Sequence, residues 1–231
     1  MNKASVSRQP VERKPRRGYH SPSRERRART TRQRVLAAAT ALFQARGYAG
    51  TSVRAIADAA GVTVPTVELL FASKPRLLKA AIDVAIAGDD QPVPMLEREW
   101  AARALATTTV FDLLAVVGHV VRESMIRSAG LVVAAFEAAA TDPGMRAVAD
   151  ELGRQRAITV GWFVDAIVLR STLRPGLTRE MAVDTVWLLM DPVVFQRLTR
   201  ERGWTPEQYQ KWFTECVARL LVPDDGGQAS T

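Results

Sequence analysis

The segment from Thr31 to Ala81 constrains the fold most strongly, because its apolar residues recur at helical spacing on both sides of a tight turn. Gly61 stands at that turn, where glycine allows the sharp change of direction that two crossing helices need. Two short helices joined in this way form a helix-turn-helix, which places its second helix in the major groove of DNA. The sequence therefore predicts a DNA-binding unit in this part of the chain.

The bounds of four helices in this region follow from their expected caps. A threonine or serine ahead of a helix accepts a hydrogen bond from a free amide of the first turn. The predicted caps are, in chain order, Thr30 or Thr31, Thr51, Thr63 and Ser73. Gly47 is expected to end the first helix in the left-handed conformation, with Tyr48 packing just beyond it.

Charge is distributed unevenly along the chain. Residues 1–34 hold 12 Lys and Arg against 2 Asp and Glu, a net +10, whereas the remainder holds 20 against 22, a net −2. Residues 1–29 also lack apolar periodicity, so they are predicted to form a disordered basic arm that follows a phosphate backbone. The alternative is a tail that serves only solubility.

Beyond the helix-turn-helix the apolar pattern remains helical, and no strand-like alternation longer than four residues occurs. Later helix starts are predicted at Asp142-Pro143, at Asp191-Pro192 and at a capping box from Thr205 to Gln208. The turn-rich stretch 88–94 separates two functional regions. The predicted fold is all-α, with a basic arm over 1–29, a helix-turn-helix domain over 30–73, a second helical domain over 74–222 and a disordered tail over 223–231.

Several classes of protein receive no support from the sequence. A single cysteine, Cys216, excludes an internal disulfide, and no apolar run approaches the ~20 residues of a membrane span. The basic N-terminus has no apolar signal-peptide core behind it, so a cytoplasmic protein is expected. His20, His119 and Cys216 cannot form a usual zinc cluster, and His119 is interpreted as a core or surface residue. No catalytic residue, metal or cofactor is expected, which leaves an enzyme as a weak alternative.

Three stretches of the chain resemble the TetR family of transcriptional regulators. They are the apolar first helix that ends in LFQARGY, then TSVRAIADAAGVT, then FASKPRLL, and the resemblance covers residues 31–80. The later stretch WLLMDPVVFQRLTRERGWTPEQYQKWF is similar but less diagnostic. The resemblance implies an all-helical homodimer whose N-terminal helices bind an operator and whose C-terminal domain binds a small, apolar effector. Most such proteins are repressors that the effector releases from DNA, by favouring a conformation with misplaced recognition helices.

The candidate DNA contacts lie at the start of the second helix, along the third and at the start of the fourth. They are Thr51, Ser52, Arg54, Thr63, Val64, Pro65, Thr66, Glu68, Leu69 and Lys74. Val64 and Pro65 suit contact with thymine methyl groups. By resemblance, Lys74 meets a phosphate at a helix N-terminus. The alternative for Thr51, Thr63 and Ser73 is capping alone.

Glu68 departs from the family pattern, which usually has an aromatic residue there that contacts a phosphate, and Leu70 stands where His or Tyr is common. A carboxylate near a phosphate is repulsive. Three interpretations remain open: other groups such as the basic arm compensate, Glu68 accepts a hydrogen bond from cytosine N4, or DNA binding is weak. The last supports an alternative function, a helix-turn-helix protein that has lost specific DNA binding and acts through ligand or protein contacts.

Effector and dimer residues are predicted from apolar side chains in the C-terminal domain, where the alternative for each is a place in the core. The effector candidates are Trp100, Phe111, Met125, Phe136, Trp162, Phe163, Trp187, Met190 and Phe195. The dimer surface is expected on Thr178–Arg202 and Thr205–Leu221, because their apolar stripes exceed what one core helix needs. Its candidates are Tyr209, Trp212, Phe213, Cys216, Val217 and Leu220, and the alternative is burial within the subunit.

Overall fold

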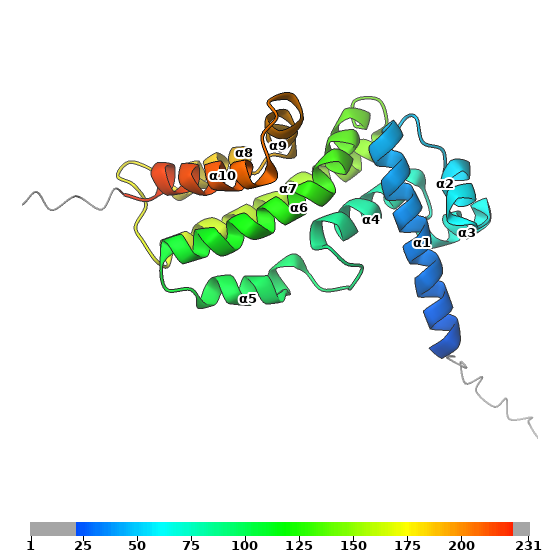
Figure 1. Cartoon of the computed structure of the whole chain (residues 1–231), viewed down its shortest axis with the longest axis horizontal. Coiled ribbons are helices and arrows are strands. Elements are labelled where there is room, and N and C mark those ends of the chain that lie inside the picture. Colours follow the sequence, from blue (N-terminus) through cyan, green and yellow to red (C-terminus); the bar gives the residue numbers. More distant parts are fainter. Residues whose placement is uncertain (1–21, 224–231) are drawn as a thin grey trace, which may run out of the picture.

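The computed structural model describes residues 22–223, and this range forms helices joined by turns, with no strand (Figure 1). The α-helices are α1 (Pro22–Arg46), α2 (Val53–Ala60), α3 (Val64–Phe71), α4 (Lys74–Ala87), α5 (Glu99–Ala106), α6 (Val110–Ala138), α7 (Pro143–Val168), α8 (Arg179–Leu189), α9 (Pro192–Gln196) and α10 (Pro206–Leu221). A 3-10 turn, Met95–Glu97, precedes α5, and a π-helical turn, Arg197–Glu201, follows α9. The prediction of an all-α fold is confirmed.

Helix α1 begins at Pro22, so the prediction that it starts at Thr30 or Thr31 is wrong. The hydroxyl of Thr30 donates to the carbonyl of Arg26 (3.0 Å), as a threonine inside a helix does. The tract ahead of it is rich in arginine, a good helix former, and it extends a helix whose later turns are packed. Residues 22–29 of the predicted arm are therefore helical, whereas residues 1–21 lie outside the described range.

Most of the predicted helix ends are confirmed. Ser73 caps α4, Asp142 caps α7 through two amides, and Thr205 and Gln208 form a reciprocal capping box. Gly47 (φ 66°) and Gly61 (φ 62°) adopt the left-handed conformation, which glycine accepts without steric cost.

Two of the predicted caps differ in the structure. The hydroxyl of Ser52, not of Thr51, accepts the first-turn bond of α2 from the amide of Ala55 (3.1 Å). Thr63 stands at the cap position of α3, but its hydroxyl meets the hydroxyl of Thr66 (2.9 Å) and no backbone amide. Neighbouring hydroxyl residues are equally good candidates in a sequence, and only the direction of the chain decides which of them faces the helix.

The buried side chains divide into two cores. The first core joins α1–α4 to the C-terminal half of α6 and the N-terminal half of α7. The second core joins α5 and α8–α10 to the other halves of α6 and α7. Helices α6 and α7 belong to both cores, and α6 runs from the end that holds α10 towards α1 (Figure 1).

Helix α10 packs its apolar stripe inward onto α6. Tyr209, Phe213, Val217 and Leu221 are fully buried in the second core, and the hydroxyl of Tyr209 donates to the carbonyl of Leu189 (2.8 Å). Gly118 of α6 permits the close approach, because a Cβ there would lie 2.5 Å from Cγ2 of Thr214. The stripe that the sequence offers for a dimer surface is thus largely used inside the subunit.

Candidate nucleic-acid interface and ligand cavity

Helix α3 turns the predicted DNA-reading residues outward. Val67 and Phe71 anchor the helix in the first core, which leaves Pro65, Glu68 and Leu69 exposed on the opposite side. Leu69 is 87% exposed, an unusual position for a large apolar side chain unless a partner covers it. Thr63 is also exposed, and Val64 and Thr66 are half-buried. These residues stay together as one candidate surface.

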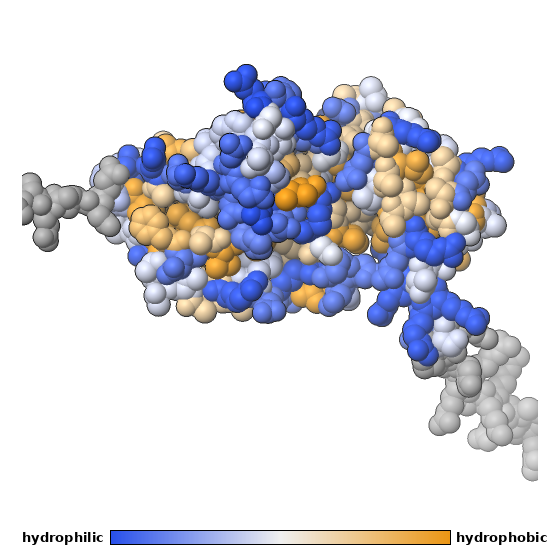
Figure 2. All heavy atoms as spheres, viewed as in Figure 1, coloured by the Kyte–Doolittle hydropathy of each residue, from blue (hydrophilic) through white to orange (hydrophobic). Residues whose placement is uncertain are grey.

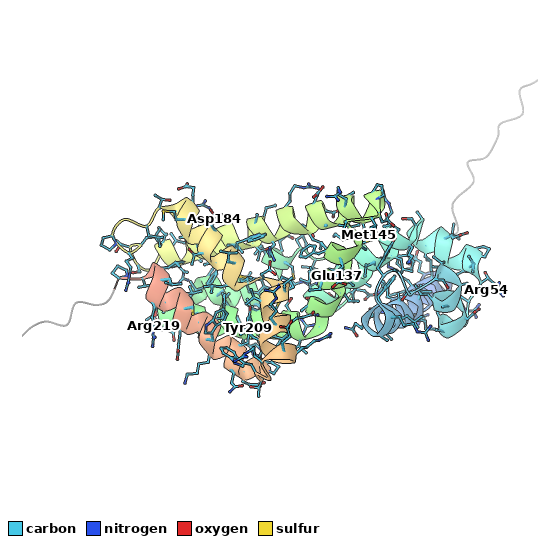
Figure 3. The ribbon with its side chains drawn as sticks, turned by 90° about the horizontal axis from the view of Figure 1, so that it is seen from above. Arg54, Glu137, Met145, Asp184, Tyr209 and Arg219 are labelled. Carbon is cyan, nitrogen blue, oxygen red and sulfur yellow. The ribbon has the colours of Figure 1, made fainter. Side chains whose placement is uncertain are left out.

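The start of α2 supplies two further exposed residues, and Thr51 is not one of them. Ser52 and Arg54 face outward, and Figure 3 shows Arg54 at one end of the molecule, with Asp184 and Arg219 at the other. Thr51 is only 1% exposed, because its hydroxyl donates to the carbonyls of Leu42 (3.1 Å) and Gly47 (2.8 Å). Its prediction as a DNA contact is wrong, since it braces the end of α1 from inside.

Lys74, at the first position of α4, belongs to a small network. Its ammonium lies 3.9 Å from the ring centroid of Tyr48, and the Tyr48 hydroxyl donates to the Asp142 carboxylate (2.8 Å). Burial lowers the pKa of Lys74, whereas the bond from Tyr48 lowers the pKa of Asp142. The network joins the N-terminus of α4, the α1–α2 loop and the cap of α7. The sequence predicts the cap and the packing of Tyr48 but not their contact across 94 residues.

Two arginines near the middle of α1 contact the helix-turn-helix. The guanidinium of Arg32 lies 4.6 Å from the ring centroid of Phe71, and that of Arg34 donates to the carbonyls of Ala60 and Gly61. Part of the positive charge counted in residues 1–34 therefore binds the C-terminal end of α2, through Arg34. The first turns of α1 instead extend away from the body, and Figure 2 shows them as a hydrophilic projection.

Glu68 presents a bare carboxylate on α3. No hydrogen bond or ion pair reaches it from any residue in the range 22–223. An exposed acid on the candidate DNA surface keeps all three interpretations of this position open.

A cavity of about 800 Å³ lies between α4, the 88–98 loop, α6, α7 and the α8–α9 junction. Three of the predicted effector residues line it: Met125, Phe136 and Met190. Its wall takes residues from both cores, such as Val132 from the first and Met125 from the second. The cavity therefore lies where the two cores meet.

The other predicted effector residues lie elsewhere. Phe111 is 67% exposed beside a groove between α6 and α10, and Phe163 and Phe195 are buried in the second core. Trp100 and Trp162 pack edge to face at 5.4 Å, outside the cavity wall. Trp187 reaches the cavity only through Arg156, whose guanidinium lies 3.7 Å from its ring centroid. An aromatic residue on a helix gives the same pattern in a core and in a pocket, so the sequence could not separate these places.

Ion pairs lie along the wall of the cavity, and most of them join residues whose spacing in the sequence predicts no contact. Arg98 binds Asp89 through two bonds (2.8 and 3.0 Å), which hold the pKa of Asp89 at about 2. Arg156 binds Asp191 (2.9 Å), and burial lowers the pKa of Arg156 while Asp191 opposes that shift. Only one pair has a spacing that suggests a contact in the sequence: Lys79 binds Asp83 (2.7 Å) one helical turn away.

The structure leaves only some of the predicted dimer residues exposed to a partner. Tyr209, Phe213 and Val217 are fully buried in their own subunit, so their prediction as interface residues is wrong. Trp212 and Cys216 are half-buried, and Leu220 is 47% exposed. Helix α8 adds the exposed side chains of Met181 and Leu188. These five residues, Met181, Leu188, Trp212, Cys216 and Leu220, are called the outer apolar residues below.

The described residues contain no candidate metal site and no candidate membrane span. No group of His, Cys, Asp or Glu in the range 22–223 could hold a metal ion. None of the helices in this range is both long and apolar enough to cross a membrane.

Comparison with known proteins places the chain in context. Residues 35–81 match the family model described as bacterial regulatory proteins, tetR family. The fold is similar to that of NalD from Pseudomonas aeruginosa, the secondary repressor of the MexAB-OprM multidrug efflux pump, with a TM-score of 0.65 and 20% identity over 87% of this chain and 100% of NalD. No curated protein sequence matches.

Two further similar structures contain small molecules. One is a transcriptional regulator from Saccharomonospora viridis in complex with choline, with a TM-score of 0.61 and 16% identity over 84% of this chain and 98% of that one. The other is FadR from Bacillus subtilis in complex with stearoyl-CoA, with a TM-score of 0.63 and 17% identity over 80% of this chain and 96% of that one.

Proposed function

We propose that this chain, which belongs to the TetR family of transcriptional regulators, is a cytoplasmic repressor that leaves its operator when a small molecule fills the cavity between the two cores. One observation carries the proposal: α4 belongs to both sites. It begins at Lys74, beside the outward surface of α2 and α3, and its later residues Ala80, Val84 and Ala87 line the cavity. A molecule that displaces α4 in the cavity therefore moves the DNA-facing end of the same helix.

The proposed DNA surface combines α3 with the starts of α2 and α4. It comprises Thr63, Val64, Pro65, Thr66, Glu68 and Leu69 with Ser52, Arg54 and Lys74, and it omits Thr51. The apolar Val64, Pro65 and Leu69 suit thymine methyl groups, while Arg54 and Lys74 suit phosphates. The projecting turns of α1 add positive charge near this surface without sequence preference.

The proposed assembly is a homodimer through α8 and α10. Their outer apolar residues lie at the end of the molecule opposite Arg54, so two subunits joined there turn their recognition helices outward (Figure 3). Two recognition helices enter successive major grooves when they lie about 34–36 Å apart. The proposed domains are a helix-turn-helix domain over 30–73 and an effector-binding and dimerisation domain over 74–222. Both domains contribute side chains to the first core.

The alternative function is a helix-turn-helix protein without specific DNA recognition, and the bare carboxylate of Glu68 is the observation that favours it. A gel-shift titration of the full chain on its own upstream region, against random DNA at stepped salt concentrations, separates the two. Repression predicts tighter binding to the upstream region, with an affinity for both DNAs that falls as salt rises. Equal binding to both DNAs would support the alternative.

A further inference from the structure

We propose that the cavity takes an uncharged, largely apolar molecule that carries a hydrogen-bond-accepting oxygen, such as a ketone, ester or lactone, held by Arg156 and Arg98. This inference rests on the proposed function, since it names the class of effector for that site. Three features of the cavity carry it: an apolar wall, charges that are mostly paired, and arginine donors that lack an acceptor.

The wall of the cavity is mostly apolar and adaptable. Met125, Val132, Phe136, Leu152 and Met190 line its inner part. Methionine fills irregular space and tolerates different shapes, so this wall suits a flexible hydrocarbon body. A volume of about 800 Å³ falls in the range of cavities that enclose small organic molecules.

Most charged groups on the wall have an ionic partner; among the described residues, Arg32 has only a ring contact with Phe71, and the rim acids Asp90 and Glu97 have no cation partner. Asp89 is bound to Arg98, Arg156 to Asp191, and Asp83 to Lys79. A charged molecule would have to break one of these pairs or lie beside a neutralised one, and a buried charge without a partner is costly. Burial lowers the pKa of Arg156, so this place already disfavours charge.

Two donors on these arginines have no acceptor. The Nε atoms of Arg98 and Arg156 are buried and have no hydrogen-bond partner among the described residues. A buried donor without an acceptor is destabilising. Both Nε atoms are closed to solvent in the structure, so an uncharged oxygen satisfies them, without adding a charge, once the arginine side chain turns towards the cavity. Trp187 covers one face of the Arg156 guanidinium, so an acceptor must approach its edge, where the N–H groups point.

Two acidic residues at the rim of the cavity argue for a cationic ligand and so against the proposal. Asp90 accepts a bond from the Gln33 amide (3.1 Å) and has no cation partner in the range 22–223, and Glu97 is exposed on the same loop. Both lie on the 88–98 loop, where water reaches them, so a cation bound there gains little. A cationic probe is therefore the comparison that most directly challenges the proposal.

The test uses the full chain and three probes that share one hydrocarbon length: methyl decanoate, decanoate and decyltrimethylammonium. Isothermal titration calorimetry without DNA ranks their affinities. Methyl decanoate is expected to bind about tenfold tighter than either charged probe, because decyltrimethylammonium has no acceptor for the arginine N–H groups and decanoate must bring its carboxylate charge into an apolar cavity. Tighter binding of decanoate or decyltrimethylammonium, or binding of none of the three, overturns the proposal.

Matched arginine-to-lysine variants test the anchor. Arg156→Lys and Arg98→Lys keep the charge that pairs with Asp191 and Asp89 but remove the Nε donor. Each is expected to weaken methyl decanoate binding, whereas Arg179→Lys, in a surface pair with Asp165, leaves it unchanged. Unchanged affinity in both cavity variants overturns the anchor. Failure to bind operator DNA bears only on the proposed function, because these titrations contain no DNA.

Discussion

The two cores differ in what they are made of. The first core is built mainly from aliphatic side chains of α1–α4, whereas the second holds stacked and tilted aromatic rings, including Phe163, Tyr209 and Phe213. Helices α6 and α7 enter both, so the boundary between the cores runs across the middle of two helices and not along a linker. The helix-turn-helix head is therefore packed into the rest of the chain, and the wall of the cavity includes residues from both cores.

Under the proposed function, this arrangement explains how a small molecule would act at a distance. A molecule in the cavity contacts α4 from the first core and Met190 from the α8–α9 junction at once. It changes the relative position of the cores only by binding one arrangement better than the other. Because α4 continues to Lys74, that change reaches the DNA surface through one rigid element.

The largest effect is expected from damage to the second core. Phe213→Ala removes a fully buried ring and should lower the free energy of unfolding by about 3–5 kcal/mol, as judged by urea denaturation. Leu220→Ala, on the same helix but with a half-exposed side chain, should lower the free energy of unfolding far less. Equal losses in the two variants would mean that α10 is buried differently from the structure, and the comparison between inner and outer faces would fail.

The next effect concerns assembly. Leu188→Glu combined with Leu220→Glu places two acids among the outer apolar residues and should give monomers of unchanged helicity, by light scattering and circular dichroism. Leu105→Glu, an exposed leucine of α5, serves as the control and should stay dimeric. A dimer that persists in the double variant places the interface away from α8 and α10.

Glu68→Tyr distinguishes two interpretations of Glu68 on the helix-turn-helix: a position near a phosphate and a contact with a cytosine. If Glu68 lies near a phosphate, which is the interpretation we favour, the change removes a repulsion and tightens binding to operator and random DNA together. If Glu68 accepts from a cytosine, discrimination at one base pair falls by roughly 1–3 kcal/mol and random-DNA binding stays the same. Competition binding with single-base operator variants distinguishes these outcomes.

The smallest effect is the pH dependence of the link between head and body. The Tyr48 bond lowers the pKa of Asp142, so the bond stabilises the folded state above the ordinary carboxyl pKa of 3.8 and this contribution is lost as pH falls through the lowered value. Tyr48→Phe should lower the melting temperature at neutral pH, and the difference from the unchanged protein should shrink below pH 3.8. A difference that is the same at both pH values would show that Asp142 plays no part.

Local rules predicted a large share of this fold. Caps and glycines placed the ends of α2–α4, α7 and α10, because a cap depends on residues within one turn of the helix. The first turns of α1 were missed, because an arginine-rich tract without an apolar face reads equally as a charged arm or as an exposed extension of a packed helix.

The sites were harder to predict than the helices. The stripe from Tyr209 to Leu220 has the same spacing whether it faces a core or a partner, and the packing of α6 through Gly118 decides the matter. The pairs of Arg98 and Arg156 join residues that share no local pattern, so they appear only once the chain is folded. Leu69 and Glu68 were placed correctly on an outward face because α3 is short and its buried residues are unambiguous.

A substitution that fills the cavity without any ligand tests most directly whether the cavity is coupled to the DNA surface. Ala87 lines the cavity in the last turn of α4, and Ala87→Phe should mimic the effector, while Ala102→Phe on the exposed side of α5 is the control. Fluorescence anisotropy should show operator affinity at least about tenfold weaker for Ala87→Phe, a typical size for coupling between sites, with a dimer and helicity as before. Operator affinity in a folded, dimeric Ala87→Phe variant equal to that of the unchanged protein would contradict the account, because the cavity would then be filled without any effect on the DNA surface.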